Sequence, residues 1–185
     1  MEAPLLIRSA LADDAAAIAR IYGHHVAHGL GTFEEMAPSA SEMLRRMAAV
    51  IARGLPYLVA VDGNEVLGFA YAGPFRLRAA YRYTVEDSVY VAHEAIGRGV
   101  GRALLSAILR ACELNGLRQI VAVIGDSGNA ASIGLHAALG FRHLGVLPSL
   151  GFKHGRWVDV VWMQKALNDG AATPPDGPGV DLRDT

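Results

Sequence analysis

The chain has 185 residues, 52% of them hydrophobic and 19% charged, which is typical of one compact domain and excludes a disordered protein. Its formal net charge of −1 argues against general nucleic-acid binding, because such proteins need a basic surface to displace counterions. A small metabolite or a cofactor is therefore the expected ligand. No apolar run approaches the roughly 20 residues that span a bilayer, so we expect no membrane segment.

The first part of the chain predicts one strand followed by two helices. Leu5–Arg8 reads as a short strand, and Asp13 and Asp14 are placed to cap a helix that extends towards His28. The second helix begins more sharply, because Ser39–Glu42 has the spacing of a capping box.

The remainder of the chain alternates between strand and helix patterns. Apolar residues at helical intervals predict one helix from Val100 to the Asn115-Gly116 pair and another over Asn129–Leu139. Strands are predicted over residues 57–61, 65–71, 83–91, 119–124, 141–147 and 157–164. This order predicts an α/β protein with a mixed sheet flanked by helices. The glycines and prolines of residues 168–185 predict a flexible tail after a domain of residues 1–167.

A glycine-rich turn, Gly97-Arg98-Gly99-Val100-Gly101-Arg102, stands between a predicted strand and a predicted helix. Glycines allow positive φ and a close approach of the backbone to a ligand. The amides at the start of the helix then point at one spot, where the helix dipole favours an anion. Arg98 and Arg102 add positive charge at the rim, so a pyrophosphate is the natural occupant. The turn alone leaves open a tight strand-to-helix connection without a ligand.

Two other phosphate-binding motifs do not fit this turn. A dinucleotide-binding fold places its glycines after the first strand and an acidic residue about 20 residues later, whereas this turn follows roughly the fourth strand. A P-loop requires Gly-Lys followed by Ser or Thr, and the sequence has no such triplet after the turn.

The turn resembles the acetyl-CoA loop of the GNAT superfamily of N-acetyltransferases. That loop is written (Arg/Gln)-x-x-Gly-x-(Gly/Ala), and Ile96–Gly101 matches both small positions, with Ile96 in place of arginine or glutamine. A second family pattern, an asparagine followed by a helix that ends in Gly-Phe, is matched by Asn129, Ser132, His136, Gly140 and Phe141.

A closer resemblance is to phosphinothricin acetyltransferases and to related enzymes that act on methionine sulfoximine and methionine sulfone. It spans roughly residues 5–167 and is carried by the segments Thr32–Glu34, Tyr71–Arg76, Ala80–Arg82, Val85–Val91, Ala122–Gly125 and Gly151–Gly155. The resemblance implies a GNAT fold, with a mixed, mostly antiparallel twisted sheet flanked by helices. It also implies acetyl transfer from acetyl-CoA to the α-amine of a small amino-acid-like acceptor by a cytoplasmic homodimer.

The resemblance implies a set of coenzyme contacts along the strand, the turn and the following helix. The expected residues are Val89, Tyr90, Val91, Gly97, Arg98, Gly99, Val100, Gly101, Arg102, Asn129 and Ser132. The backbone of residues 89–91 would offer donors and acceptors along an open strand edge, as in peptide β-augmentation. Asn129 also suits a helix N-cap, and the two roles are compatible.

Glu86 is the candidate general base for the acceptor amine. By the period of two in a strand it shares a face with Ser88 and Tyr90, so the three can line a cleft. An ordinary glutamate pKa of about 4.3 is too low for this task, so Glu86 needs burial or an intervening water. The alternative is a structural glutamate in a buried hydrogen-bond network. The resemblance implies that His136 serves as acid, base or positioning group, against the alternative of a structural core histidine.

The resemblance implies acceptor contacts at Phe33, Arg76, Arg78, Tyr81, Tyr90 and Gly125. Arginine suits carboxylate, phosphinate or sulfonyl oxygens, although an exposed arginine cluster is otherwise a solvated surface. Other acceptors, namely a polyamine, an antibiotic or a protein N-terminus, are alternatives, as is a non-catalytic acyl-CoA-binding module.

Two further features are expected to be structural. His24, His25 and His28 lack a neighbouring carboxylate or a further histidine that would complete a zinc-type set, so no metal is expected. Cys112, the single cysteine, falls on the apolar stripe of its helix and is expected to be buried. A lone cysteine forms no internal disulfide, which fits the reducing cytoplasm.

Overall fold

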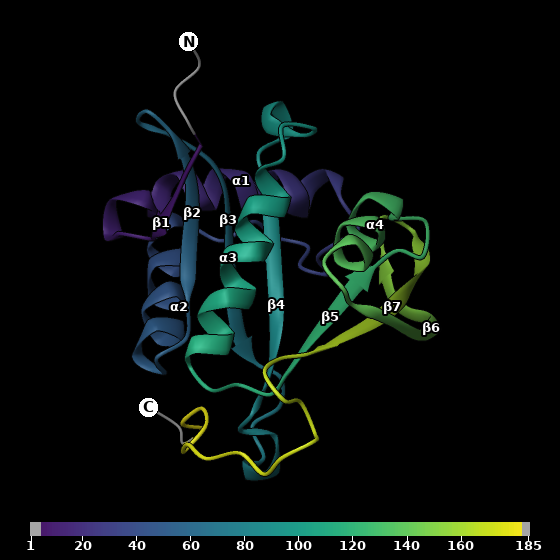
Figure 1. Cartoon of the computed structure of the whole chain (residues 1–185). Coiled ribbons are helices and arrows are strands. Elements are labelled where there is room, and N and C mark those ends of the chain that lie inside the picture. The colour runs from purple at the N-terminus through teal and green to yellow at the C-terminus, as the bar shows by residue number, and fades with distance from the viewer. Residues whose placement is uncertain (1–4, 183–185) are drawn as a thin grey trace.

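The computed structural model describes residues 5–182 and shows one seven-stranded sheet with helices on both faces (Figure 1). The strands are β1 Leu6–Ser9, β2 Tyr57–Asp62, β3 Glu65–Pro74, β4 Thr84–Val91, β5 Gln119–Gly125, β6 Arg142–Lys153 and β7 Arg156–Ala166. The helices are α1 Ala15–His28, α2 Ala40–Ala52, α3 Val100–Leu114 and α4 Ala130–Ala138. Short 3₁₀ turns cover Ala12–Asp14, Ala79–Tyr81 and His93–Ala95.

The strand order is β1-β2-β3-β4-β5-β7-β6, and each neighbouring pair is antiparallel except β4 and β5. The predicted α/β class and the mostly antiparallel sheet are therefore confirmed. None of the helices within residues 5–182 is both long and apolar enough to cross a membrane.

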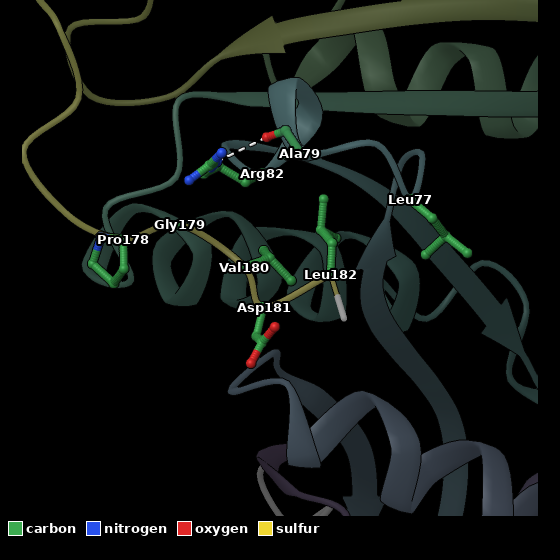
Figure 2. Close-up of a pocket in the computed structure, with 8 residues that line it drawn as sticks. All are labelled: Leu77, Ala79, Arg82, Pro178, Gly179, Val180, Asp181 and Leu182. Atoms are coloured by element: carbon green, nitrogen blue, oxygen red, sulfur yellow. Dashed lines mark hydrogen bonds between the residues drawn. The ribbon is translucent and has the colours of Figure 1, made fainter. Parts of the chain in front are cut away.

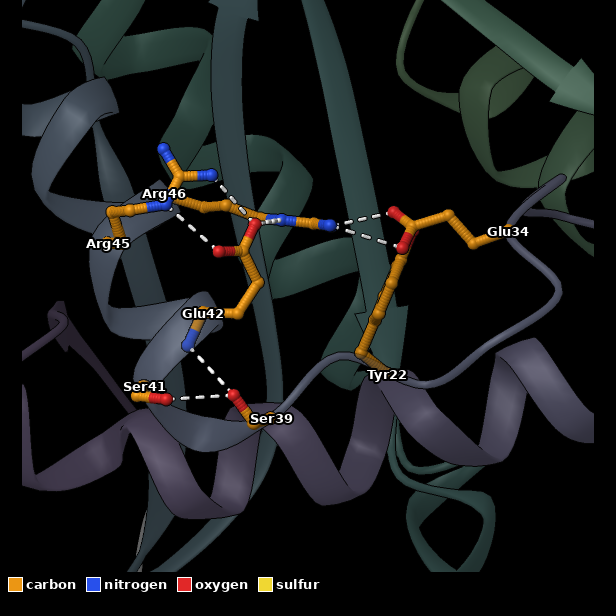
Figure 3. Close-up of polar contacts among 7 residues, drawn as sticks. All are labelled: Tyr22, Glu34, Ser39, Ser41, Glu42, Arg45 and Arg46. Carbon is orange, nitrogen blue, oxygen red and sulfur yellow. Dashed lines mark hydrogen bonds and ion pairs between the residues drawn. The ribbon is translucent and has the colours of Figure 1, made fainter.

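Helix α3 packs on one face of the sheet, and α1 and α2 pack on the other (Figures 1 and 3). The stripe of α3 that faces the sheet consists of Val100, Leu104, Ile108 and Cys112, which follow one another at intervals of four and are all fully buried. Burial raises the pKa of the Cys112 thiol to about 12, so this side chain behaves as the small hydrophobe expected from the sequence.

The sheet splits between β4 and β5. These two strands pair only over Thr84–Glu86 and Gln119–Val121. Beyond that point β4 continues along β3, while β5 continues along β7 and slants away from β4 (Figure 1). The divergence leaves a backbone edge on each strand facing a gap instead of a sheet neighbour.

The two predicted helix caps differ in outcome. Ser39 caps α2, because its hydroxyl accepts the Glu42 amide at 3.1 Å, but the Glu42 carboxylate binds Arg45 and Arg46 instead of completing the box (Figure 3). Asp14 makes no side-chain cap bond to α1, but its carboxylate accepts the Leu11 amide at 2.7 Å at the start of the 3₁₀ turn that precedes α1. The same carboxylate accepts from the Arg8 guanidinium and therefore ties this helix start to the first strand.

The C-terminal segment is packed on the domain over residues 168–182, which its composition did not predict. The Tyr83 hydroxyl donates to the Gly177 carbonyl at 2.7 Å, and the Val180 amide donates to the Arg82 carbonyl at 2.8 Å. Val180 is only 6% exposed. Figure 2 shows residues 178–182 opposite the loop that carries Arg82, where the two segments line a pocket of about 600 Å³. The boundary at residue 167 stays a prediction.

Candidate active site

A cleft of about 770 Å³ opens where β4 and β5 diverge. Its walls are β4 and β5, the turn before α3 with the first residues of that helix, one side of α4, and the loop that follows α1. Of the residues expected from the sequence, the cleft is lined by Phe33, Glu86, Val89, Tyr90, Val91, Gly97, Gly99, Val100, Gly101, Arg102, Gly125, Asn129, Ser132 and His136. One cavity thus brings together the glycine turn and the candidate base.

The start of α3 forms one end of the cleft. Gly97 and Gly99 have φ of 84° and 78°, a left-handed conformation that favours glycine. The first backbone bond of the helix runs from the Ala103 amide to the Gly99 carbonyl. The amides of the three preceding residues, 100–102, therefore have no acceptor within the helix. Positions 97 and 99 also have no atom within 4 Å of where a Cβ would stand, so an anion can approach this turn.

The two arginines of the turn lie differently. Arg102 lines the cleft. The Arg98 guanidinium pairs with the Asp62 carboxylate at 2.9 Å, and its amide already donates to the Ala95 carbonyl. Arg98 does not line the cleft, and its expected contact with the coenzyme stays a prediction.

The edge of β4 that faces the cleft consists of main-chain groups. In an antiparallel ladder alternate residues point their N–H and C=O to opposite edges, and the Ala92 amide donates to the Leu67 carbonyl of β3. The backbone N–H and C=O groups of Val89 and Val91 therefore point away from β3. The Val91 carbonyl accepts from His25 Nε2 at 2.9 Å. The Val89 groups and the Val91 amide are used by neither neighbouring strand and fit an extended, amide-containing ligand arm.

Glu86 lies in the cleft on the same face as Ser88 and Tyr90, as the strand period predicts. Burial raises the pKa of its carboxyl to about 7, the neighbouring Asp87 charge adds to this rise, and the Arg76 charge opposes it. A carboxylate with a pKa near the working pH is suited to accept a proton from an ammonium group.

His136 is 3% exposed, and both of its ring nitrogens have hydrogen-bond acceptors. Nδ1 lies 2.7 Å from the Ser132 carbonyl and Nε2 lies 2.9 Å from Asp87 Oδ2. The Ser132 carbonyl accepts from Nδ1, and Nε2 forms the hydrogen bond with the Asp87 carboxyl group. Burial lowers the pKa of His136, but the Asp87 carboxylate and the Ser132 carbonyl outweigh burial and leave it above its usual value.

Sequence reasoning missed Asp87. Strand alternation turns its side chain away from the face of Glu86, so it was not among the candidates. Its side chain reaches α4 because the split of the sheet brings that helix against the other face of β4. Asn129 is a helix N-cap, because its side-chain oxygen accepts the Ser132 amide at 3.1 Å, and it also lines the cleft.

The expected acceptor contacts divide into two groups. Phe33, Tyr90 and Gly125 line the cleft. Arg76, Arg78 and Tyr81 are exposed on the loop between β3 and β4 and do not line it. Arg76 lies over the ring of the residue before it, 5.3 Å from the ring centroid, and Tyr81 packs edge-on against that same ring at 5.5 Å.

The histidines near the end of α1 gather without forming a metal centre. The His24 ring lies 4.8 Å from that of His28 and 5.0 Å from that of His93. Within residues 5–182 no group of three or more His, Cys, Asp or Glu side chains is arranged to hold a metal ion.

A split sheet edge beside a helix N-terminus and a carboxylate with a raised pKa suits an enzyme that binds an extended anionic ligand and accepts a proton from an amine. The sequence matches the acetyltransferase (GNAT) domain family over residues 7–162. The chain therefore belongs to the GNAT family and is an acetyl-CoA-dependent N-acetyltransferase.

Known proteins resemble the chain over nearly its whole length. A phosphinothricin N-acetyltransferase from Alcaligenes faecalis is 55% identical over 164 residues, which cover 89% of this chain and 83% of that protein. An L-methionine sulfoximine/L-methionine sulfone acetyltransferase from Pseudomonas paraeruginosa is 40% identical over 91% of this chain and 98% of that protein. The crystal structure of a phosphinothricin acetyltransferase from Sinorhizobium meliloti in complex with AcCoA superposes with a TM-score of 0.90, at 46% identity over 93% of each chain.

Proposed function

We propose that the protein acetylates the α-amine of a small, anionic amino-acid-like acceptor such as phosphinothricin, methionine sulfoximine or methionine sulfone. The observation that carries this proposal is one cleft lined by the glycine turn and the first residues of α3, by Glu86 with its raised pKa, and by Phe33. The names of the similar proteins support the class of acceptor.

Acetyl-CoA supplies the thioester. We place its diphosphate at the amides of residues 100–102 and its pantetheine arm along Val89 and Val91, with Asn129 and Ser132 on the opposite wall. This orientation brings the thioester carbonyl towards Glu86. The chain's contribution is then to orient the two reactants and exclude water between them.

The acceptor ammonium loses two protons on its way to the amide, and the departing sulfur gains one. Glu86 accepts the first, directly or through a water molecule, and the free amine attacks the thioester carbon. As the carbon–nitrogen bond forms and the carbon–sulfur bond breaks, the nitrogen loses its second proton and the coenzyme A thiolate takes up one. We assign His136 a positioning role, because it is buried and both of its ring nitrogens are already engaged, by the Ser132 carbonyl and by Asp87.

Phe33, Tyr90 and Gly125 form the acceptor side of the cleft in this proposal. Arg76, Arg78 and Tyr81 act at its rim, where the guanidinium groups attract an anionic acceptor and repel a cationic one. Their exposure outside the cleft makes their contribution smaller than that of the lining residues.

A thiol-release assay with a panel of amines tests the proposal. Phosphinothricin and methionine sulfone should release coenzyme A and give N-acetylated products that mass spectrometry identifies. Spermidine, an aminoglycoside and an N-terminal peptide serve as the competing acceptors. Turnover of one of these with no turnover of the amino-acid analogues would overturn the assignment, and release with no amine at all would indicate hydrolysis.

We also propose that the protein is a homodimer that uses the apolar surface of β6 and β7. Strand β6 is the last strand of the sheet, and its exposed apolar side chains, with that of β7, are Leu144, Val146, Leu147, Leu150, Phe152 and Trp157. An apolar strand without a sheet neighbour is a site for association.

Light scattering on the eluted protein tests the dimer. The mass should be twice the 19.6 kDa of one chain, and Leu150→Asp should halve it. Leu114→Asp, on the exposed end of α3, is the matched control and should leave the mass unchanged. A wild-type mass of one chain contradicts the dimer. We further propose a cytoplasmic location, which the buried free thiol of Cys112 and the use of acetyl-CoA support and cell fractionation tests.

A further inference from the structure

The loop of residues 29–34 links the end of α1 to the segment before α2 and forms a wall of the cleft. It contains no helix or strand, so its own backbone bonds do not fix its shape. Phe33 projects from this loop and is the residue that the proposed function places against the acceptor. The contacts that hold the loop therefore determine the position of the Phe33 ring.

Lys153 at the end of β6 binds the backbone of this loop. Its Nζ donates to the carbonyl oxygens of Gly29 at 2.9 Å and Thr32 at 2.7 Å, although 121 residues or more separate the partners in sequence. The side chain is 2% exposed. A buried ammonium is costly unless it is hydrogen-bonded, so the two carbonyls and the lysine depend on each other.

The turn between β6 and β7 fixes the direction of Lys153. The two residues of this turn, His154 and Gly155, have φ of 50° and 75°, as in the two-residue hairpin turns that match the twist of a sheet. Lys153 pairs with Arg156 directly across this turn. The lysine therefore projects from a rigid corner of the fold.

A second set of contacts holds the side-chain side of the same loop (Figure 3). The Tyr22 hydroxyl donates to Glu34 at 2.8 Å and lies 2.7 Å from the Thr32 hydroxyl, which donates to it. Arg46 of α2 grips the Glu34 carboxylate with two nitrogens, at 2.6 Å and 3.2 Å. The Tyr22 ring also packs edge-on against Tyr90 in the cleft, with centroids 4.9 Å apart.

The loop lies tightly on two strands at positions where both have glycine. A Cβ on Gly125 of β5 would collide with the Leu30 carbonyl oxygen, and a Cβ on Gly151 of β6 would collide with the Phe33 ring. The loop and its aromatic side chain thus rest against the sheet with no room for a further methyl group.

We infer that Lys153 is a positioning residue for the acceptor side of the cleft: it holds the carbonyls of Gly29 and Thr32 and so keeps Phe33 seated against the sheet. This inference rests on the proposed function, because it takes the Phe33 wall as the place where the acceptor binds. The role is to fix the geometry of the acceptor subsite, and no proton transfer is assigned to the lysine.

Lys153→Met tests the inference in kinetic terms, because methionine has a similar length and cannot donate. The Michaelis constant for phosphinothricin should rise roughly tenfold or more, as expected for the loss of charged hydrogen bonds that fix one wall. The dissociation constant for coenzyme A should change less than about twofold, since the coenzyme end of the cleft is built elsewhere. Lys165→Met, the same replacement on the neighbouring strand β7, is the control and should change neither constant.

Hydrogen exchange of the unliganded protein tests the same inference without any acceptor. Amides in the peptide that spans residues 29–35 should exchange faster in Lys153→Met than in the wild type, while peptides from β2 and β3 keep their protection. This readout stands even if the wild type acetylates none of the proposed acceptors. A failure of the proposed function is therefore distinguishable from a failure of this inference.

Two further variants maintain the test if Lys153→Met does not fold. Tyr22→Phe removes the hydroxyl contacts to Thr32 and Glu34 but keeps the ring, and Gly151→Ala displaces the Phe33 ring without touching the lysine. Both should raise the acceptor Michaelis constant and spare coenzyme A binding. An unchanged acceptor constant with unchanged exchange of the loop, or an equal loss of coenzyme A affinity, would overturn the inference.

Discussion

The two ends of the cleft differ in whether backbone groups or side chains form them. The end proposed for the coenzyme consists chiefly of main-chain groups from one continuous stretch, the open edge of β4 and the first turn of α3, with Asn129 and Ser132 also lining the cleft. The acceptor end consists of side chains from α1, α2 and β6 that meet around an irregular loop. The first end is therefore formed by residues that lie close together in the sequence, whereas the second depends on contacts between distant segments.

Glu86→Gln acts where the two ends meet and should have the largest effect. Turnover should fall by roughly 10²–10⁴-fold, the range for loss of a general base, while coenzyme A affinity stays within about twofold of wild type. Because the base works when ionised, wild-type activity should rise with pH through about 7, and the variant should lack this limb. Steady-state rates from pH 5.5 to about 9 measure both effects. Unchanged turnover in the variant would remove Glu86 from its role.

Asp87→Asn should destabilise the fold by about 3 kcal/mol, because it breaks the buried contact between the Asp87 carboxyl group and His136 Nε2. The pKa of His136 is raised in the folded protein, so the pair's stabilisation is complete below its ordinary value of 6.5 and is lost as pH rises through the higher folded pKa. Urea unfolding at pH 6 and pH 9 should show this loss in the wild type and a smaller one in the variant. Equal stability of the two proteins would show that the pair is not ionic.

Gly99→Val should weaken coenzyme A binding by about 10-fold or more, since a β-branched residue at φ of 78° costs on the order of 1–3 kcal/mol and distorts the turn. Gly116→Val is a matched control at the other end of α3, where φ is 71° and no atom lies near the added Cβ. Calorimetric titration should find the loss of affinity in the first variant and not in the second. Equal affinities would contradict the assignment of the anion end.

Arg98→Ala should have the smallest effect. Its guanidinium pairs with Asp62 at the surface, where an exposed ion pair contributes on the order of 0–1 kcal/mol. Arg102→Ala, with a side chain that lines the cleft, should weaken coenzyme A binding more than Arg98→Ala does. The reverse order would show that the turn rearranges when the coenzyme binds.

The sequence predicted much of the fold and the turn before α3, because both depend on local patterns. The strand positions and the helix over Val100–Leu114 follow from periods of two and 3.6 residues, although the strand predicted over 141–147 extends to Lys153. The glycines at 97 and 99 indicate the turn directly. Glu86 was found because strand alternation places it beside two other polar residues that line the same cleft.

The features that the sequence did not predict depend on partners far along the chain. Nothing near Asp87 indicates that it meets His136, which lies 49 residues later. The ion pair between Arg98 and Asp62 was not predicted either, because Asp62 lies 36 residues earlier, at the end of β2. The contact from Lys153 to Gly29 is a similar case, because no sequence pattern indicates which backbone carbonyl a distant side chain will bind.

A crystal structure with bound acetyl-CoA tests the central claim most directly. The diphosphate oxygens should lie about 2.7–3.2 Å from the amides of residues 100–102, with the pantetheine along Val89 and Val91 and the thioester beside Glu86. A coenzyme bound with its diphosphate away from α3, or with its thioester out of reach of Glu86, would contradict the account.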